Sequence, residues 1–231
     1  MNGFYILRSR MMNRKTFVSA CLFLSFFTPT LNAAYIYDFH IFNNADYENN
    51  PNLAFTAEVF DLGGQAVFEF RNSSTMNSVI TEIYFDSEGL LELDHITNYI
   101  VDEDNKIGTK FESAESGDVH PSNLPAAHLL DPVFEANVDL SAGACNPSPK
   151  WGIGPDEKLQ IVFNIEQGHN FSDIINGLNS GTDLRIGLHI QSVDTEGVSV
   201  SAVNKVPEPI TVCLLSLGGL ALLRKRRVGT A

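Results

Sequence analysis

The central part of the chain, residues 35–204, contains almost no cysteine. The sequence has three cysteines in all, and Cys21 and Cys213 lie in apolar segments near the two ends. Cys145 is therefore alone in the central part, and a disulfide within this part is excluded. A part of about 170 residues is large enough to be held together by an ordinary apolar core instead. We expect Cys145 to be buried or inert, because no histidine lies near it in the sequence.

The central part also has few basic residues. The whole chain has 15 Lys and Arg residues against 28 Asp and Glu residues. Only six of the basic residues but 27 of the acidic ones lie between residues 35 and 204, which gives this part a formal charge of −21. Such a charge repels nucleic acid and anionic membrane surfaces. It is compatible with a solvated acidic surface, which we favour, or with the binding of cations.

Sequence motifs of common catalytic sites are also missing. There is no G-x-S-x-G serine motif and no glycine-rich phosphate loop with a lysine. The nearest pair of histidines, His120 and His128, does not have the two- or four-residue spacing of zinc sites. Paired carboxylates for glycoside hydrolysis cannot be chosen from sequence among so many acidic residues. We therefore predict no enzymatic activity and no required cofactor.

The N-terminal segment, residues 1–34, has the pattern of a secretory signal peptide. Arg14 and Lys15 precede an apolar run from Phe17 to Phe27, and the small residues Ala33 and Ala34 follow it. A charged, then apolar, then small-residue order is typical of signal peptides. We expect export of the chain, with cleavage after Ala33 or Ala34.

The C-terminal segment, residues 205–231, has three consecutive features. It begins with a proline-containing motif formed by Val206, Pro207, Glu208 and Pro209. An apolar run of 14 residues follows, from Ile210 to Leu223. As a helix this run would span roughly 21 Å, which is less than a hydrocarbon core of about 30 Å. Four cations, which would hold this end in the cytoplasm, complete the segment: Arg224, Lys225, Arg226 and Arg227.

This three-part order resembles the PEP-CTERM sorting signal of Gram-negative bacteria. The resemblance covers only about the last 25 residues and implies nothing about the fold or ligand of the preceding part. It implies recognition by an integral-membrane exosortase, cleavage near the Pro-Glu-Pro motif and delivery to the cell surface or extracellular matrix. The protein would be anchored in the membrane through the helix 210–223 until it is processed.

The central part reads as an all-β domain. In residues 158–165, for example, Leu159, Ile161, Phe163 and Ile165 alternate with polar residues, which indicates a strand with one buried face. One short helix is predicted, with Ser172 as its N-cap. Residues 102–132 are rich in charge, Gly, Ser and Pro and are expected to form a long, partly ordered excursion. The strands are predicted at residues 35–42, 53–60, 66–71, 79–85, 133–140, 158–165, 184–190 and 198–203, with one or two more within residues 90–101. Short strands separated by turns predict an antiparallel β-sandwich of jelly-roll or immunoglobulin-like type.

Two places in the central part are candidate ligand sites. Asp102 and Asp104 bear carboxylates at alternate positions, which suits calcium, with Asp86, Glu88 or Asp118 as further ligands. The same segment departs from an EF-hand at its sixth position, where Ile107 replaces glycine.

Trp151, the only tryptophan, lies in a predicted loop and could stack on a sugar ring. The alternative, which we favour, is that it covers one end of the core.

These patterns favour an exported surface or matrix protein with a structural or adhesive role. An exopolysaccharide-binding module, with or without calcium, is the alternative, and a matrix hydrolase is the third hypothesis.

Overall fold

The computed structural model describes residues 34–87, 89–114 and 121–206. These residues form antiparallel strands and one α-helix, which confirms the predicted all-β class in its general form. No helix among them combines the length and the apolar character that a membrane span requires. The predicted signal peptide and the predicted helix 210–223 lie outside the described residues.

The strands are mostly short, and their bounds follow the predicted runs closely in the first and last thirds of the central part. They are β1 (Tyr35–Ile41), β2 (Phe55–Asp61), β3 (Gln65–Asn72), β4 (Val79–Ser87), β5 (Leu91–Thr97), β6 (Tyr99–Asp102), β7 (Ile107–Thr109), β8 (Phe111–Ser113), β9 (Asn137–Ala144), β10 (Lys158–Ile165), β11 (Leu184–Val193) and β12 (Val198–Asn204). The helix is α2 (Phe171–Ser180), and a 3₁₀ turn spans Ala127–Leu129.

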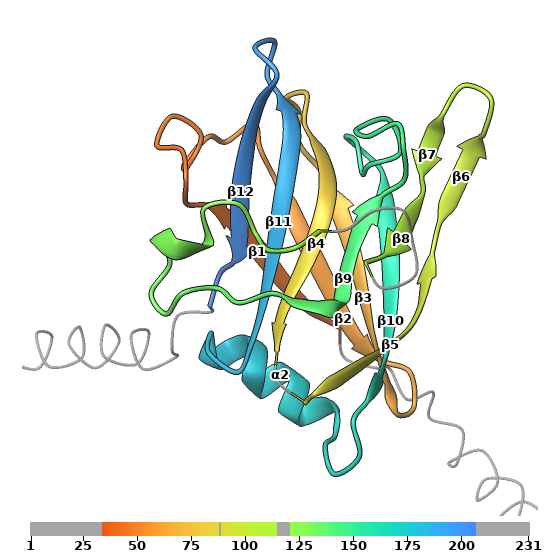
Figure 1. Cartoon of the computed structure of the whole chain (residues 1–231), viewed down its shortest axis with the longest axis vertical. Helices are drawn as coiled ribbons and strands as arrows, with labels where there is room; N and C mark the ends of the chain where they lie inside the picture. The colour runs from red at the N-terminus through yellow and green to blue at the C-terminus, as the bar shows by residue number, and fades with distance from the viewer. Residues whose placement is uncertain (1–33, 88, 115–120, 207–231) are drawn as a thin grey trace, which may run out of the picture. The chain divides into compact units, whose positions relative to one another are not determined.

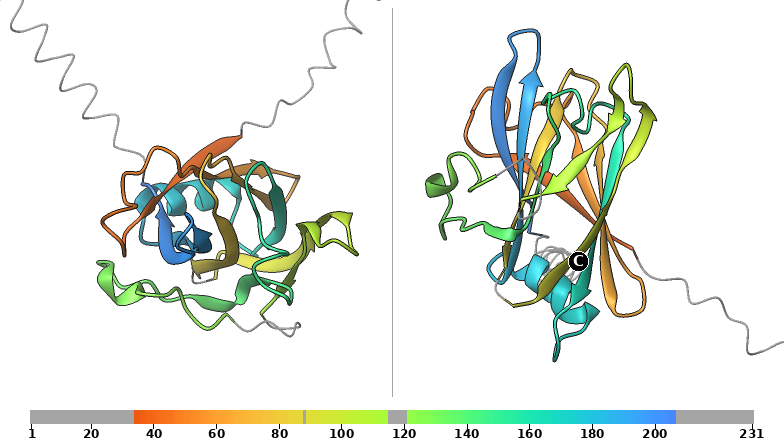
Figure 2. Two further views of the ribbon diagram at one scale, coloured as in Figure 1. Left: turned by 90° about the horizontal axis from the view of Figure 1, so that it is seen from above. Right: turned by 45° about the vertical axis from the view of Figure 1, so that its right-hand side comes forward.

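Ten of the described strands form one sheet in the order β5-β10-β3-β2-β1-β12-β11-β4-β9-β8. The strand β1 is the corner of this sheet. Its first half, Tyr35–Asp38, pairs with β2, whereas Phe39–Ile41 pairs with β12. The sheet therefore bends at β1, and its two halves face each other across the core (Figures 1 and 2).

The side chain of Asn98 links the two ends of this sheet. Its Oδ1 accepts from the backbone N–H of Phe111 at 2.7 Å, and its Nδ2 donates to the Phe111 carbonyl at 3.0 Å. An amide side chain thus takes the place of a backbone partner between the end of β5 and the start of β8. The strands β6 and β7 form a separate hairpin that stands out from the sheet (Figure 1).

A group of phenylalanine rings joins the two halves of the sheet. Phe85 of β4 makes edge-on contacts with Phe163 of β10 and with Phe68 and Phe70 of β3, at centroid separations of 4.7, 5.3 and 6.2 Å. All four side chains are fully buried. Such contacts are worth about 0.5–1.5 kcal/mol each beyond their burial, so this group is a large contribution to the packing of the two halves.

Helix α2 closes one end of the core with its apolar face. Ile174, Ile175 and Leu178 are buried in the main core cluster. The N-cap is Asn170 and not Ser172, so the predicted cap was two residues too late. Asn170 accepts from the Ser172 N–H, and Asp173 accepts from the Asn170 N–H in return, which completes a capping box.

The middle of the chain differs most from its prediction. The segment predicted as an excursion contains β7 and β8, and β8 pairs with β9. Within this segment Phe111 is buried, whereas Leu129 is 59% exposed. The strand predicted at residues 133–140 begins only at Asn137, because residues 121–136 form a segment that crosses the outer face of β12, β11 and β4 (Figure 1).

A β-bulge in β4 explains a second difference. The sequence alternation places Ile80 and Ile83 on opposite faces, yet both are fully buried. In the pairing with β11, His189 lies opposite Glu82 and Ile190 lies opposite Ile80, which leaves Thr81 without an opposite residue. The extra residue reverses the alternation at that point, so that both isoleucines face the core.

Glu69 of β3 is a buried carboxylate on the opposite face from Phe68 and Phe70. It accepts from Lys158 Nζ at 2.9 Å and from Gln160 Nε2 at 2.7 Å, and it pairs with Arg71. Burial acts to raise the pKa of Glu69, but these hydrogen bonds and positive charges outweigh it and hold the pKa below its ordinary value.

Candidate functional site

A polar pocket of about 430 Å³ lies between the end of β4 and the turn that joins α2 to β11. Asp86 and Ser87 contribute one wall, Thr182 and Asp183 the other, and Leu90 adds an apolar side chain. Pairing of Ser87 with Leu184 in the β4–β11 ladder brings these two walls together. The volume is within the range of small-molecule sites.

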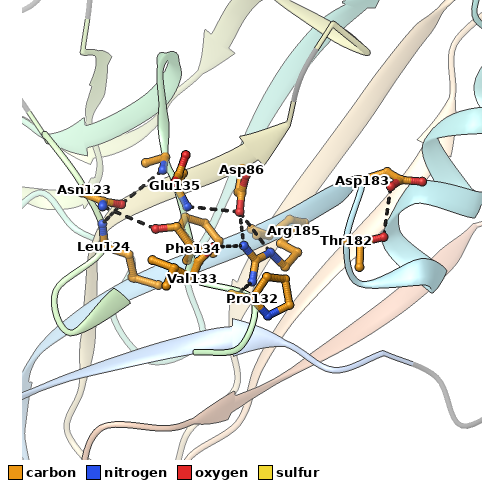
Figure 3. A network of polar contacts seen from close by, with 12 residues as sticks. Asp86, Asn123, Leu124, Pro132, Val133, Phe134, Glu135, Thr182, Asp183 and Arg185 are labelled. Atoms are coloured by element: carbon orange, nitrogen blue, oxygen red, sulfur yellow. Dashed lines mark hydrogen bonds and ion pairs between the residues drawn. The ribbon is translucent and has the colours of Figure 1, made fainter. Parts of the chain in front are cut away.

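The Asp86 wall is fixed by a buried arginine. Arg185 donates to Asp86 Oδ2 through Nε at 3.0 Å and through Nη2. Its Nη1 also donates to the Pro132 carbonyl at 2.6 Å, and Nη2 donates to the Val133 carbonyl at 2.5 Å. Figure 3 shows the Asp86 carboxylate turned toward this guanidinium group. The arginine thus joins the sheet to the segment 121–136.

Asn123 holds the other end of the same segment (Figure 3). Its Oδ1 accepts from the N–H groups of Leu124 and Ala136 at 2.8 and 3.2 Å. Phe134 and Leu124 pack on Tyr84 and Val203 in a second apolar cluster. This packing needs a glycine beneath it, because a Cβ at Gly187 would lie 2.8 Å from Leu124 Cδ2.

The hydroxyl group of Ser87 is the unusual feature of the pocket. Ser87 is only 4% exposed, and its Oγ has no hydrogen-bond partner among the described residues. An unsatisfied buried polar group costs about 1–3 kcal/mol, and such groups are few in native structures. On the opposite wall Thr182 Oγ1 donates to Asp183 Oδ1 at 3.0 Å. The pocket therefore combines two carboxylates with the Thr182 hydroxyl group, whereas Ser87 Oγ is buried within its wall.

This donor and acceptor set suits the binding of hydroxyl-rich molecules. Carboxylate oxygens accept hydrogen bonds from sugar hydroxyl groups, and serine or threonine can donate or accept. Glycoside hydrolysis would need one protonated and one ionised carboxyl group. Asp86 is unsuited to either role, because its Oδ2 is bound by Arg185 and by the Glu135 N–H. The geometry favours binding over bond cleavage.

The chain matches no protein-family model, no curated protein and no solved structure. The argument for function therefore depends on the geometry of the site and on the sequence patterns.

The structure separates the predicted calcium ligands. Asp102 and Asp104 lie at the tip of the β6–β7 hairpin, whereas Asp86 lies beside α2 at the other end of the sheet (Figure 1). Asp102 bonds within its own turn, accepting from the Asn105 N–H at 3.0 Å and from Asn105 Nδ2 at 2.7 Å. These hydrogen bonds lower the pKa of Asp102. No cluster of three or more acidic, histidine or cysteine side chains suited to a metal occurs among residues 34–87, 89–114 and 121–206.

Trp151 is 2% exposed. Lys106 Nζ and Lys110 Nζ lie over its indole ring, 5.2 and 5.7 Å from the ring centroid. A ring in this position has no free face for a sugar, so the structure favours the alternative in which Trp151 packs against the core. Lys106 belongs to the same turn as Asp102, so Trp151 lies close to this turn. This proximity was not predicted from the sequence.

Of the predicted sorting residues, only Val206 is described. Val206 packs against Gly181, the C-cap of α2, and Lys205 N–H donates to the Asp38 carbonyl at 2.7 Å. The remaining sorting residues lie outside the described residues: Pro207, Glu208, Pro209, Arg224, Lys225, Arg226 and Arg227. Glu88, Asp118 and His120 lie outside as well.

Sequence reasoning missed Ser87, Thr182 and Asp183. The only signal in the sequence was that all three residues lie at or near the end of a strand, where polar residues are common. Cys145 is buried as expected, and burial, with the hydrogen bond and charge of Glu112, raises the pKa of its thiol to about 12.

Proposed function

We propose that this chain is an exported surface or matrix protein whose body, an antiparallel β-sandwich of jelly-roll or immunoglobulin-like type, adheres to extracellular polysaccharide. The Asp86–Asp183 pocket is the observation that carries this proposal. Its two carboxylates and the exposed Thr182 hydroxyl group fit sugar hydroxyl groups.

The net charge of the central part, residues 35–204, supports a neutral ligand. A net charge of −21 would repel anionic polymers, so the proposed ligand is an uncharged or cationic polysaccharide. For this pocket we propose a structural or adhesive role, since Arg185 occupies the Asp86 carboxylate that general acid or base catalysis there would need.

The binding proposal is tested with the full chain and a panel of neutral polysaccharides on a glycan array. Asp183→Asn removes a charged acceptor, and hydrogen bonds to charged groups are worth about 1.5–3 kcal/mol. We expect its affinity to fall roughly tenfold or more. Asp46→Asn, an equal change of charge in the exposed β1–β2 loop, should bind as the parent does.

Ser87→Ala gives a second, more specific result. Removal of an unsatisfied buried hydroxyl group should leave stability unchanged or raise it by about 1 kcal/mol, and ligand affinity should stay unchanged because Ser87 Oγ is buried within the wall. Equal binding by the parent and Asp183→Asn would contradict the proposed pocket.

The sorting part of the proposal depends on the PEP-CTERM-like tail and on the signal peptide. An exosortase would be the processing partner, and the cell surface or matrix of a Gram-negative bacterium the destination. Mass spectrometry of surface-delivered protein tests this. Loss of residues 210–227 from the mature product is the expected result, and their retention would contradict processing.

The calcium component rests on Asp102 and Asp104 alone. Isothermal titration calorimetry of the full chain with calcium tests it, using Asp102→Ala combined with Asp104→Ala. A calcium signal that the double variant lacks would support the site, and the same signal in both proteins would contradict it.

A further inference from the structure

A carboxylate, an imidazole and a hydroxyl group form a continuous hydrogen-bonded chain on the outer face of β4, β11 and β12. They belong to Glu82, His189 and Ser199. His189 Nδ1 lies 2.6 Å from Glu82 Oε2, and His189 Nε2 lies 2.5 Å from Ser199 Oγ. The same order of groups activates the serine hydroxyl group of acyl-transfer enzymes, where it is recognised by geometry and not by position in the sequence.

Strand pairing brings these three residues together. His189 lies opposite Glu82 in the β11–β4 ladder and opposite Ser201, two residues from Ser199, in the β11–β12 ladder. Their sequence neighbours Ile83, Leu188 and Val200 are fully buried in the core. Because side chains alternate along a strand, the three polar side chains point to the outer face.

Of the three residues in this chain, Ser199 is the exposed one. Tyr84, which is buried beneath the segment 121–136, donates to Glu82 Oε2 at 2.7 Å. The side chains of Glu82 and His189 are 25% and 15% exposed, and Ser199 is exposed. The hydroxyl group is therefore accessible from solvent, while the groups behind it are held by the sheet.

Glu82 is suited to orient the imidazole. Burial acts to raise the pKa of Glu82, but hydrogen bonds from His189 and Tyr84 and the charge of His189 outweigh it and lower the pKa. In the neutral form of the imidazole, an ionised Glu82 keeps the proton on Nδ1, which leaves Nε2 free to accept the hydroxyl proton. Thr81 Oγ1 also donates to the His189 carbonyl at 3.3 Å, which fixes the backbone.

We propose that Ser199 is a nucleophile for acyl transfer from carboxylic esters, with His189 as its general base and Glu82 as a positioning residue. Ser199 Oγ attacks the ester carbonyl carbon, and its proton passes to His189 Nε2. The bond to the leaving alcohol breaks, and the alcohol takes that proton. Water then attacks the acyl-serine, gives a proton to His189 and releases the acid, while Ser199 recovers its proton. An exposed serine on a strand face suits an ester group carried on the surface of a large molecule.

This site is separate from the Asp86–Asp183 pocket and does not depend on the proposed binding function. The first test is labelling of the full chain with a fluorophosphonate, in which a Ser–O–P bond forms and fluoride leaves. Peptide mass spectrometry should place the adduct on Ser199. The second is hydrolysis of p-nitrophenyl acetate, measured as kcat and KM.

Ser199→Ala should abolish both signals, and His189→Gln should reduce them at least about 100-fold, the contribution of general-base catalysis. Glu82→Gln should lower kcat while KM stays unchanged, which a merely structural role would not produce. Ser122→Ala, another exposed serine, is the matched control. If His189→Gln does not fold by circular dichroism, Glu82→Gln makes the same comparison. No adduct on Ser199, or labelling that is equal in Ser199→Ala, would overturn the proposal.

Discussion

The ion pair between Asp86 and Arg185 should be one of the most sensitive points of the fold. The two side chains are 16% and 9% exposed, so water can do little to compensate for the loss of either charge. Removing one partner of a buried pair typically costs about 3–5 kcal/mol, because the other charge stays buried. Asp86→Asn leaves the guanidinium group with the Pro132 and Val133 carbonyls, so we expect the lower end, about 3 kcal/mol.

Arg185→Met should cost more, because it leaves both carbonyls without a donor as well as leaving Asp86 unpaired. We expect about 4–5 kcal/mol for this variant. The double variant, Asp86→Asn with Arg185→Met, removes both charges and should be less destabilised than the sum of the single variants. A loss of about 3 kcal/mol corresponds to roughly 6–12 °C in Tm for a domain of this size.

Urea unfolding followed by fluorescence measures these free energies, because Trp151 is the only tryptophan and is buried in the native state. Asp183→Asn, which removes an exposed carboxylate nearby, should change stability by no more than about 0.5 kcal/mol. If Asp86→Asn lost less than about 1 kcal/mol, the pair would not be what holds the segment 121–136, and the reasoning would be refuted.

Three further predictions concern other parts of the fold. The folded pKa of Glu69 lies below its ordinary value of 4.5, so its contribution to stability is complete above that value and is lost as the pH falls through the folded pKa. Glu69→Gln should therefore be less stable near neutral pH and lose less stability on acidification, as measured by unfolding at about pH 7, 5 and 3. Cys145, with a pKa of about 12, should resist iodoacetamide in the folded protein at about pH 8 and react with it in urea. Rapid labelling of Cys145 without urea would contradict its burial. Gly108 has a φ of +102°, and a Cβ there would collide with the Tyr99 carbonyl. Gly108→Ala should therefore open the β6–β7 hairpin and shift the fluorescence of Trp151, which lies against Lys106 of this hairpin. An unchanged emission spectrum would contradict this prediction.

Strands that bury one face in regular alternation could be predicted from the sequence. β10 has the predicted bounds, and Leu159, Ile161 and Phe163 are all fully buried. Prediction from alternation was wrong at the Thr81 bulge. The amino-acid types around Thr81 do not show that the strand contains an extra residue there. The three-residue strands β7 and β8 are too short for a period of two to be recognised.

The sites could not be predicted, for a different reason. The pocket joins Ser87 to Asp183, and the polar chain joins Glu82 to Ser199, so each depends on which strands are neighbours. The pairing of β4 with β11 is a property of the whole fold and cannot be predicted from the sequence of either strand. Asp102 and Trp151 attracted attention because their residue types are informative, yet hydrogen bonds within a turn and burial account for their positions.

The position of β1 sets the order in which the body can be completed. Phe39 pairs with Asn204, so the first strand of the described chain cannot gain its second neighbour until the last strand has been synthesised. Contacts between such distant residues slow folding, because a long loop must close before they form. A newly made chain would therefore remain open for longer than one built from local hairpins, which would suit the export that we propose.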